Sequence, residues 1–312
     1  MIRIFLYKND ECYKQCKQID PDFDLYGEDF KIIQDGIDKH KETLEVPTQE
    51  EADLCLFSTR NKMCWSTHYN TRKLWANIRA ETSQILYPDK SAIIDYDDNP
   101  IRLMPDNAKF YFKRSTSDLV ENKLVAYNRQ VYHLPYCVRP DLEIAQEVNW
   151  ANRPIDISIL FPPIPRITRR NAIAFAVQQS NFLKQYKKQI GLVSQGGRSA
   201  RQCLSEPYHR LLLNTKILIN CNPEPWEGDM RLFEAMACGC CVMNDITPQL
   251  PNSVKNIAYY DRYSTEDVLT KAAYYASNPD ISKDLAHKSL LETKASHQTT
   301  NRIDKILNVC LN

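Results

Sequence analysis

The sequence predicts an α/β fold in two domains. A length of 312 residues, divided by about 150 residues per domain, gives close to two domains. Short strand-type runs alternate with helical or polar segments along most of the chain, which is typical of α/β proteins. Glycine is scarce, and five of the seven glycines lie between residues 191 and 239. We therefore expect tight backbone geometry in that region.

Charge and hydropathy exclude two broad classes of protein. Lys and Arg number 40 and Asp and Glu 39, a net charge of +1, so no global field gathers nucleic acid or anionic lipid. No apolar run approaches the roughly 18 to 20 residues that span a bilayer, so we expect no transmembrane segment. Residues 1–7 are typical of a first strand and not of a signal peptide, which predicts a cytoplasmic protein.

The 11 cysteines are predicted to be reduced and mostly buried, because they form no paired CxxC framework. Cys238, Cys240 and Cys241 could be interpreted as a metal site, but no second ligand pair stands at zinc spacing. Packing of small apolar thiols is the favoured interpretation, and we expect no bound metal or other cofactor.

The first domain is expected to cover residues 1–150 and the second residues 151–312. Predicted strands of the first domain are 3–7, 31–33, 52–58, 92–94, 109–112 and 131–134. The segment 136–154 mixes proline, charges and Trp150, and a new strand-type run starts at Ile155, which places the boundary near residue 150.

The second domain shows a regular succession of elements. We expect strand 155–161, helix 169–188, strand 191–195, helix 207–214 and strand 216–220, followed by a loop, a helix and a strand. Asp229 can cap the start of that later helix, and Gly239 can form a left-handed turn at its end. Residues 264–267 are typical of a capping box that opens a helix to about Ser277, and a polar helical tail follows.

Residues 216–243 form the most informative segment: a strand, a polar loop, a capped helix, a glycine and a buried strand. This segment resembles the nucleotide-sugar signature of GT-B glycosyltransferases, in particular the group 1 and spore-maturation-protein-like enzymes, whose motif is approximately R-x-F-E-A-x-A-x-G. The matching residues are Arg231, Phe233, Glu234, Ala235, Ala237 and Gly239. Segments 109–114, 134–136 and 208–220 resemble other parts of the same enzymes, in the same order.

The resemblance implies two Rossmann-like domains facing across a cleft. It implies a sugar-nucleotide donor on the second domain, an acceptor hydroxyl on the first and transfer of a hexosyl or pentosyl group without a bound metal. The acceptor would be a glycan or another hydroxyl compound. The C-terminal tail of such enzymes crosses back to the first domain.

The residue types of this segment fit a sugar nucleotide, which needs cations or N–H groups for its diphosphate and a carboxylate for its ribose diol. Arg231, in the first turn of its helix, is the first choice for the diphosphate, with Arg169 or Arg170 as helpers. Glu234 is the choice for the ribose. The remaining candidates for donor binding are Glu227, Gly228, Asp229 and Lys216. The alternative is that Arg231 and Glu234 form an exposed ion pair on an ordinary helix.

One departure from the motif leaves the stereochemistry undecided. Retaining members of the resembled family carry another Glu eight positions before the last Glu of the motif. Here that position is Trp226, with Glu224 and Glu227 nearby.

An inverting transfer needs a base, and the candidates in the first domain are Asp95, Asp97 and His68. Residues 95–98 also contain a D-x-D pattern after a predicted strand, which is how metal-dependent GT-A glycosyltransferases hold Mn²⁺. A plain turn explains the same residues. A GT-A-like enzyme is therefore the first alternative, and inhibition by EDTA separates the two.

Two further alternatives stay open. The chain could be a non-catalytic α/β module that binds nucleotides. Basic runs at 166–170 and 184–188 could hold a nucleic-acid acceptor, although the neutral net charge disfavours it.

Overall fold

The computed structural model describes residues 1–8, 28–58, 84–96, 107–114, 131–161, 168–191, 205–222, 228–247 and 250–312. The chain divides into two units, one of residues 1–135 with 299–312 and one of residues 136–298. Residues 136–150 thus lie with the second unit, not with the first as predicted. The physical reason is local, because Ala145 N donates a hydrogen bond to the carbonyl of Ala237 and Val148 lies against Gly239.

The first unit contains a parallel sheet in the order β2-β1-β3-β4-β5-β6. Its strands are β1 Ile2–Leu6, β2 Thr43–Glu45, β3 Leu54–Ser58, β4 Ser91–Asp95, β5 Phe110–Lys113 and β6 Val131–His133. The described helices of this unit are α2 Glu28–Lys39, the short 3-10 helix η1 Pro88–Lys90 and α11 Thr299–Cys310. The C-terminal tail therefore packs with the N-terminal sheet unit.

The predicted strand at 31–33 is wrong, because these residues lie inside α2. Phe30, Ile33 and Ile37 are all buried, and their spacing of three and four residues places them on one face of a helix. The short apolar run was taken for a strand because periodicity over three residues does not separate the two structures.

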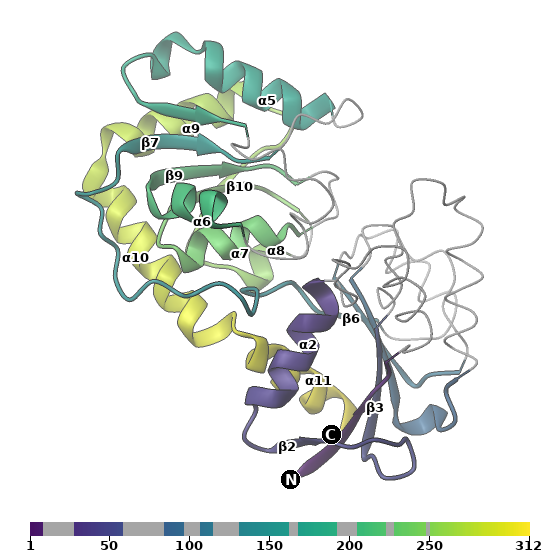
Figure 1. The fold of residues 1–312 in the computed structure, drawn as a ribbon. Coiled ribbons are helices and arrows are strands. Elements are labelled where there is room, and N and C mark those ends of the chain that lie inside the picture. Colours follow the sequence, from purple (N-terminus) through teal and green to yellow (C-terminus); the bar gives the residue numbers. More distant parts are fainter. Residues whose placement is uncertain are drawn as a thin grey trace, which may run out of the picture. The chain divides into compact units, whose positions relative to one another are not determined.

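Helices α2 and α11 lie side by side (Figure 1). Gly36 permits this approach, because a Cβ atom at that position would lie 2.7 Å from Cγ1 of Ile303 and 2.8 Å from the carbonyl oxygen of Thr299. The Thr299 hydroxyl also donates a 2.6 Å hydrogen bond to Asp35. The tail is thus fixed to α2 by close packing and by a side-chain hydrogen bond.

The second unit contains a parallel sheet in the order β11-β10-β9-β7-β8. Its strands are β7 Ile155–Ile159, β8 Lys188–Ile190, β9 Thr215–Asn220, β10 Cys241–Asp245 and β11 Ala258–Tyr260. Its described helices are α5 Thr168–Gln179, η2 Asn181–Leu183, α6 Glu206–Leu213, α7 Met230–Ala237, α8 Leu250–Ser253, α9 Thr265–Ser277 and α10 Pro279–Ser296.

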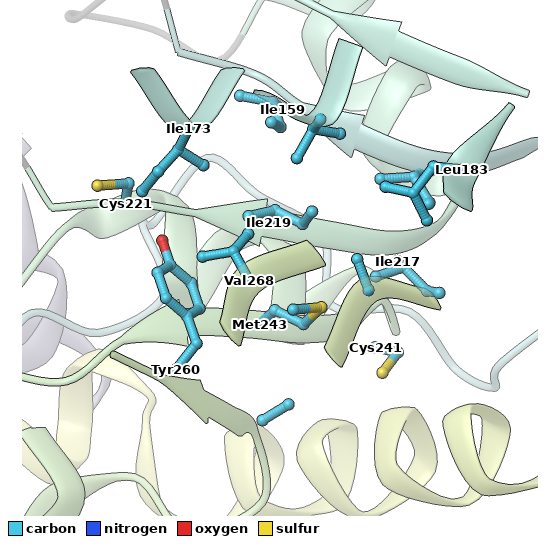
Figure 2. Packing of buried hydrophobic residues seen from close by; sticks show 14 of the residues in the cluster. Ile159, Ile173, Leu183, Ile217, Ile219, Cys221, Cys241, Met243, Tyr260 and Val268 are labelled. Carbon is cyan, nitrogen blue, oxygen red and sulfur yellow. The ribbon is translucent and has the colours of Figure 1, made fainter. Parts of the chain in front are cut away.

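Helices cover both faces of this second sheet. Helices α5 and α9 pack together on one face, α6 and α7 lie on the other, and α10 packs against both α9 and α7 (Figure 1). Ile159, Ile219 and Met243 of the sheet meet Ile173 and Val268 of α5 and α9 (Figure 2). All five side chains are buried. The prediction of an α/β fold with parallel sheets is therefore confirmed.

Most predicted elements of the second unit match, and the region after α5 differs. Helix α5 ends at Gln179 and not near residue 188, because Ser180 has an extended backbone, with φ −63° and ψ 125°. The next strand, β8, starts at Lys188, whereas the sequence predicted a strand that starts at residue 191. Gly191, which follows β8, has a φ of 88°.

Both predicted ends of helix α7 are confirmed. The Asp229 side chain accepts a hydrogen bond from Arg231 N at the start. Gly239 has a φ of 69°, and N–H groups of Gly239 and Cys240 donate to the carbonyls of Met236 and Ala235, which is a Schellman motif. The predicted cap of α9 is also confirmed, because Ser264 accepts from Asp267 N.

Buried Arg153 fixes the end of α7 to the neighbouring elements. Its guanidinium donates to the carbonyl of Cys238 at the end of α7 and to the carbonyl of Thr215 at the start of β9. A cation at the C-terminus of a helix also complements the helix dipole. Helix α7 is thus held at both ends by side chains.

A buried polar network ties together the carboxyl ends of β9, β10 and β11. Asp245 accepts hydrogen bonds of 2.8 and 2.7 Å from the backbone and side-chain nitrogens of Asn222, and Arg262 lies 3.2 Å from its other oxygen. Tyr260 donates to the Asn220 carbonyl. Burial raises the pKa of Asp245 to about 6.

Among the helices that the structure describes, none combines the length and the apolar composition that a membrane span requires.

Replacing Gly36 with Ala should destabilise the protein. A methyl group would overlap the Thr299 backbone and the Ile303 side chain, a cost of about 1–3 kcal/mol that exceeds the gain of about 1 kcal/mol in helix propensity. Thermal or denaturant unfolding measures the loss. The matched control is Gly228→Ala, where the added methyl group meets nothing within 4 Å. Equal stabilities of the two variants would contradict the close packing of α2 and α11.

The pH dependence of stability should reveal the buried carboxyl of Asp245. Its folded-state pKa of about 6 exceeds the ordinary value of 3.8, so the folded chain binds this proton more tightly than the unfolded chain. The native free energy of unfolding therefore loses about 3 kcal/mol as pH rises from about 4 to about 6.

The variant Asp245→Asn carries no such proton and keeps the oxygen that accepts from Asn222. We expect the free energy of unfolding of the variant, relative to that of the native chain, to increase by about 3 kcal/mol between pH 4 and pH 7. Urea unfolding of both proteins at several pH values measures the difference. A difference that stays constant with pH would contradict the raised pKa.

Candidate functional site

The start of helix α7 lies beside the carboxyl end of β9, which is where parallel α/β sheets bind their ligands. Strand β9 occupies a central position of its sheet, with β7 on one side and β10 on the other. Charged side chains from α5, α7 and the segment after β11 gather at this edge. They form the candidate site.

Asp229 holds two arginines at the start of α7. Arg231 Nη1 lies 2.8 Å from Asp229 Oδ2, and Nη2 of Arg170 donates to the same oxygen. Arg231 N donates to the other oxygen at 3.1 Å. Burial opposes ionisation of Asp229, but the guanidinium groups of Arg231 and Arg170 hold the pKa of its carboxyl below the ordinary value. Two cations thus share one carboxylate.

Arg170 is fixed independently of Asp229. Its Nε donates to the carbonyl of Cys221 just after β9, and its guanidinium lies 4.9 Å from the centroid of the Phe161 ring. The side chain is only 3% exposed, whereas that of Arg231 is 24% exposed. Arg231 is therefore the cation of this pair that solvent reaches more readily.

Glu234 is buried and already has partners. Tyr208 OH donates a 2.6 Å hydrogen bond to its Oε2, and Arg139 Nη1 lies 3.4 Å from its Oε1. The carboxylate side chain is 5% exposed. The alternative of an exposed Arg231–Glu234 ion pair is therefore wrong, because Arg231 turns to Asp229 and Glu234 turns to Tyr208 and Arg139.

The other predicted donor residues are dispersed. Arg169 lies with Nη1 3.4 Å from the Thr265 hydroxyl at the start of α9, and Gly228 immediately precedes the cap residue of α7. Lys216 lies at the amino end of β9, where its Nζ pairs with Asp156 at 2.8 Å. Lys216 is about 13 Å along β9 from Asn220 and therefore lies at the amino end of the strand, opposite the candidate site. We leave Lys216 out of this site. Glu227 lies outside the described residues.

Asp95, a predicted base, ends strand β4 of the first unit and is engaged in a buried cluster. Its Oδ1 lies 3.1 Å from Lys113 Nζ, and Tyr111 OH donates to its Oδ2. The side chain of Lys113 is completely buried. Both carboxylate oxygens of Asp95 are thus engaged by side chains of the neighbouring strand β5, so this geometry does not favour Asp95 as the base. Asp97 and His68 lie outside the described residues.

The cysteines at the end of α7 are packing residues. Cys238, Cys240 and Cys241 are all buried, and burial raises the pKa of Cys241 to about 12. In the part of the chain that the structure describes, no group of three His, Cys, Asp or Glu side chains could hold a metal ion.

Arg139, Tyr208, Asp245 and Arg262 were not predicted to lie near the site. Arg139 lies in segment 136–154, where the sequence predicts a domain boundary, and Tyr208 lies in the predicted helix 207–214. Asp245 follows a buried strand, which is the same signal that singled out Asp95. Position after a buried strand could therefore have identified Asp245.

Chemically, this edge of the sheet suits an anion. It offers two guanidinium groups, a helix start and a further arginine, Arg262, at the end of β11, against the carboxylates of Asp229 and Asp245. Guanidinium groups and helix N-termini are the usual partners of phosphate groups.

Part of the second unit matches a known protein family. Residues 168–308 match the family model described as glycosyl transferase-like. A search of curated proteins by sequence gives no match.

Solved structures show the same fold at low sequence identity. An α-glucosyltransferase in complex with UDP and a 13-mer DNA containing an HMU base is 9% identical, with a TM-score of 0.54, and the match covers all of both chains. HepE from Anabaena, in complex with UDP and glucose, is 11% identical over 99% of each chain, with a TM-score of 0.52.

Sucrose-phosphate synthase from Thermosynechococcus elongatus is 12% identical over 83% of this chain and 73% of its own, with a TM-score of 0.53. The match to TarM covers 74% of this chain, which spans 56% of the length of TarM. The chain thus has a two-sheet α/β fold like that of these solved structures, and its residues 168–308 match a glycosyl transferase-like family model.

Proposed function

We propose that the protein transfers a hexosyl or pentosyl group from a sugar nucleotide to an acceptor hydroxyl without a bound metal. The observation that carries this proposal is the pair of arginines at the start of α7, at the carboxyl edge of a parallel sheet, inside the segment that matches the glycosyltransferase-like family. A nucleotide diphosphate is the part of the donor that this charge pattern fits.

The proposed chemistry at this site is electrostatic. When the bond between the sugar and the diphosphate breaks, negative charge grows on the leaving phosphate. Arg231 and Arg170, fixed beside the start of α7, would stabilise that charge without the help of a divalent cation. Preorganised cations are effective here because no reorganisation is needed during the reaction.

Glu234 has a different place in this proposal from the one first expected. Its carboxylate is buried and accepts from Tyr208 and Arg139, so a ribose diol could bind only to the lone pairs that these donors leave. We propose that Glu234 chiefly positions the first turns of α7. Glu234 can therefore match the sequence motif without contacting the ribose of the donor directly.

The acceptor side rests on fewer observations. Lys113 and Tyr111 engage Asp95, so Asp97 and His68 stay the candidates for a base in an inverting reaction. We propose a glycan or another hydroxyl compound as acceptor. The structural neighbour that binds DNA keeps a nucleic-acid acceptor as the alternative, which steep salt dependence of acceptor binding would support.

We also propose a cytoplasmic location. None of the described cysteines forms a disulfide, and all except Cys310 are buried. Free thiols are typical of proteins that work in a reducing compartment.

Replacing Arg231 with Ala should weaken donor binding and slow transfer. Loss of one charge-assisted contact to a phosphate is worth about 2 kcal/mol, so we expect the Kd for UDP to rise by roughly 30-fold. Calorimetric titration measures the change. The matched control is Arg210→Ala, which removes an exposed arginine paired with Glu206 on α6 and should leave the Kd unchanged. An Arg231→Ala protein that binds UDP as tightly as the native chain would count heavily against the assignment.

Removing divalent metal should leave the reaction intact. If arginines neutralise the diphosphate, hydrolysis of UDP-glucose or its transfer should proceed at the same rate in EDTA as in buffer with Mg²⁺ or Mn²⁺. Complete loss of turnover in EDTA, with recovery on addition of Mn²⁺, would instead support the GT-A-like alternative. UDP binding without any turnover would support the nucleotide-binding module.

A further inference from the structure

Asp229 occupies the place where the site should bind its anion. Its carboxylate accepts a hydrogen bond from Arg231 N at the start of α7. The same carboxylate also pairs with the guanidinium groups of Arg231 and Arg170. These are the same three features that the proposed function assigns to a diphosphate. The protein thus provides an anion of its own for the site.

The local charge balance depends strongly on Asp229. Two guanidinium groups against one carboxylate leave a single net positive charge on this trio. If a diphosphate binds while Asp229 stays in place, Asp229 has already neutralised half of the positive charge of the two arginines. The diphosphate then also lies within a few ångströms of a carboxylate. Repulsion at such distances is worth several kcal/mol even at an effective dielectric constant of about 20.

The arrangement does not depend on Asp229 alone. Arg170 is also held by the Cys221 carbonyl and the Phe161 ring, and the backbone of Arg231 is fixed in α7, so its guanidinium can turn to another anion at the same place. The Asp229 side chain is 11% exposed and that of Arg231 is 24% exposed, so solvent reaches this carboxylate. The anion site can therefore persist while the carboxylate is displaced or neutralised.

We propose that Asp229 is an internal counter-ion that competes with the donor diphosphate for Arg170, Arg231 and the start of α7, and so sets the affinity of the site for its donor. This inference rests on the proposed function, since it assumes that the same edge of the sheet binds a diphosphate. It predicts that loss of the negative charge strengthens ligand binding, whereas loss of a purely structural cap would weaken it.

The test is the variant Asp229→Asn. Asparagine caps helices about as well as aspartate and has nearly the same shape, so the variant removes the charge and keeps the start of α7. Calorimetric titration with UDP and with inorganic pyrophosphate should give a Kd at least about tenfold lower than that of the native chain. The same gain for both probes locates the effect at the diphosphate.

The matched control is Asp156→Asn, which removes the same charge at the opposite edge of the sheet, beside Lys216, and should leave both Kd values unchanged. If the native chain binds UDP and Asp229→Asn binds it equally or more weakly, Asp229 is a cap or a ligand-positioning residue and the inference is wrong. If neither protein binds UDP or pyrophosphate, the proposed donor site is wrong as well. Binding by the variant alone would support the inference in its strongest form.

Discussion

The shared carboxylate of Asp229 joins the elements on which the candidate site depends. Arg170 comes from α5 and Arg231 from α7, about sixty residues later, and both reach the same side chain. The Arg170–Cys221 hydrogen bond adds the end of β9 to this assembly. This one carboxylate thereby joins two helix starts and a strand end, because two guanidinium groups left without any anion would carry uncompensated charge.

The surrounding fold keeps this assembly rigid. Arg153 and the Gly239 turn hold the far end of α7, and the network around Asp245 holds the ends of three neighbouring strands beneath it. Such support is what an electrostatic site requires, because cations stabilise growing charge only when they are already in position. The packing of the second unit and its proposed chemistry are therefore parts of one arrangement.

Local patterns in the sequence were sufficient for the α/β fold, for most strands and for both ends of α7, because caps and left-handed glycines depend on neighbouring residues. The predicted strand at 31–33 is wrong because a run of three residues is too short to separate a helix from a strand, and the helical spacing appears only when Phe30 and Ile37 are included. The site was predicted through Arg231 and Asp229, but the partners of Glu234 could not be. Arg139 and Tyr208 reach Glu234 only through tertiary packing. Lys216 lies away from the candidate site because it is at the amino end of β9, beside Asp156.

The central claim is that the start of α7 binds a nucleotide diphosphate, and a crystal structure of the chain with bound UDP tests it most directly. Our account predicts both phosphates beside the Arg231 guanidinium and the first turn of α7, with Arg170 within reach of one of them. A structure in which UDP lies elsewhere, while Arg170 and Arg231 still face only Asp229, would contradict it.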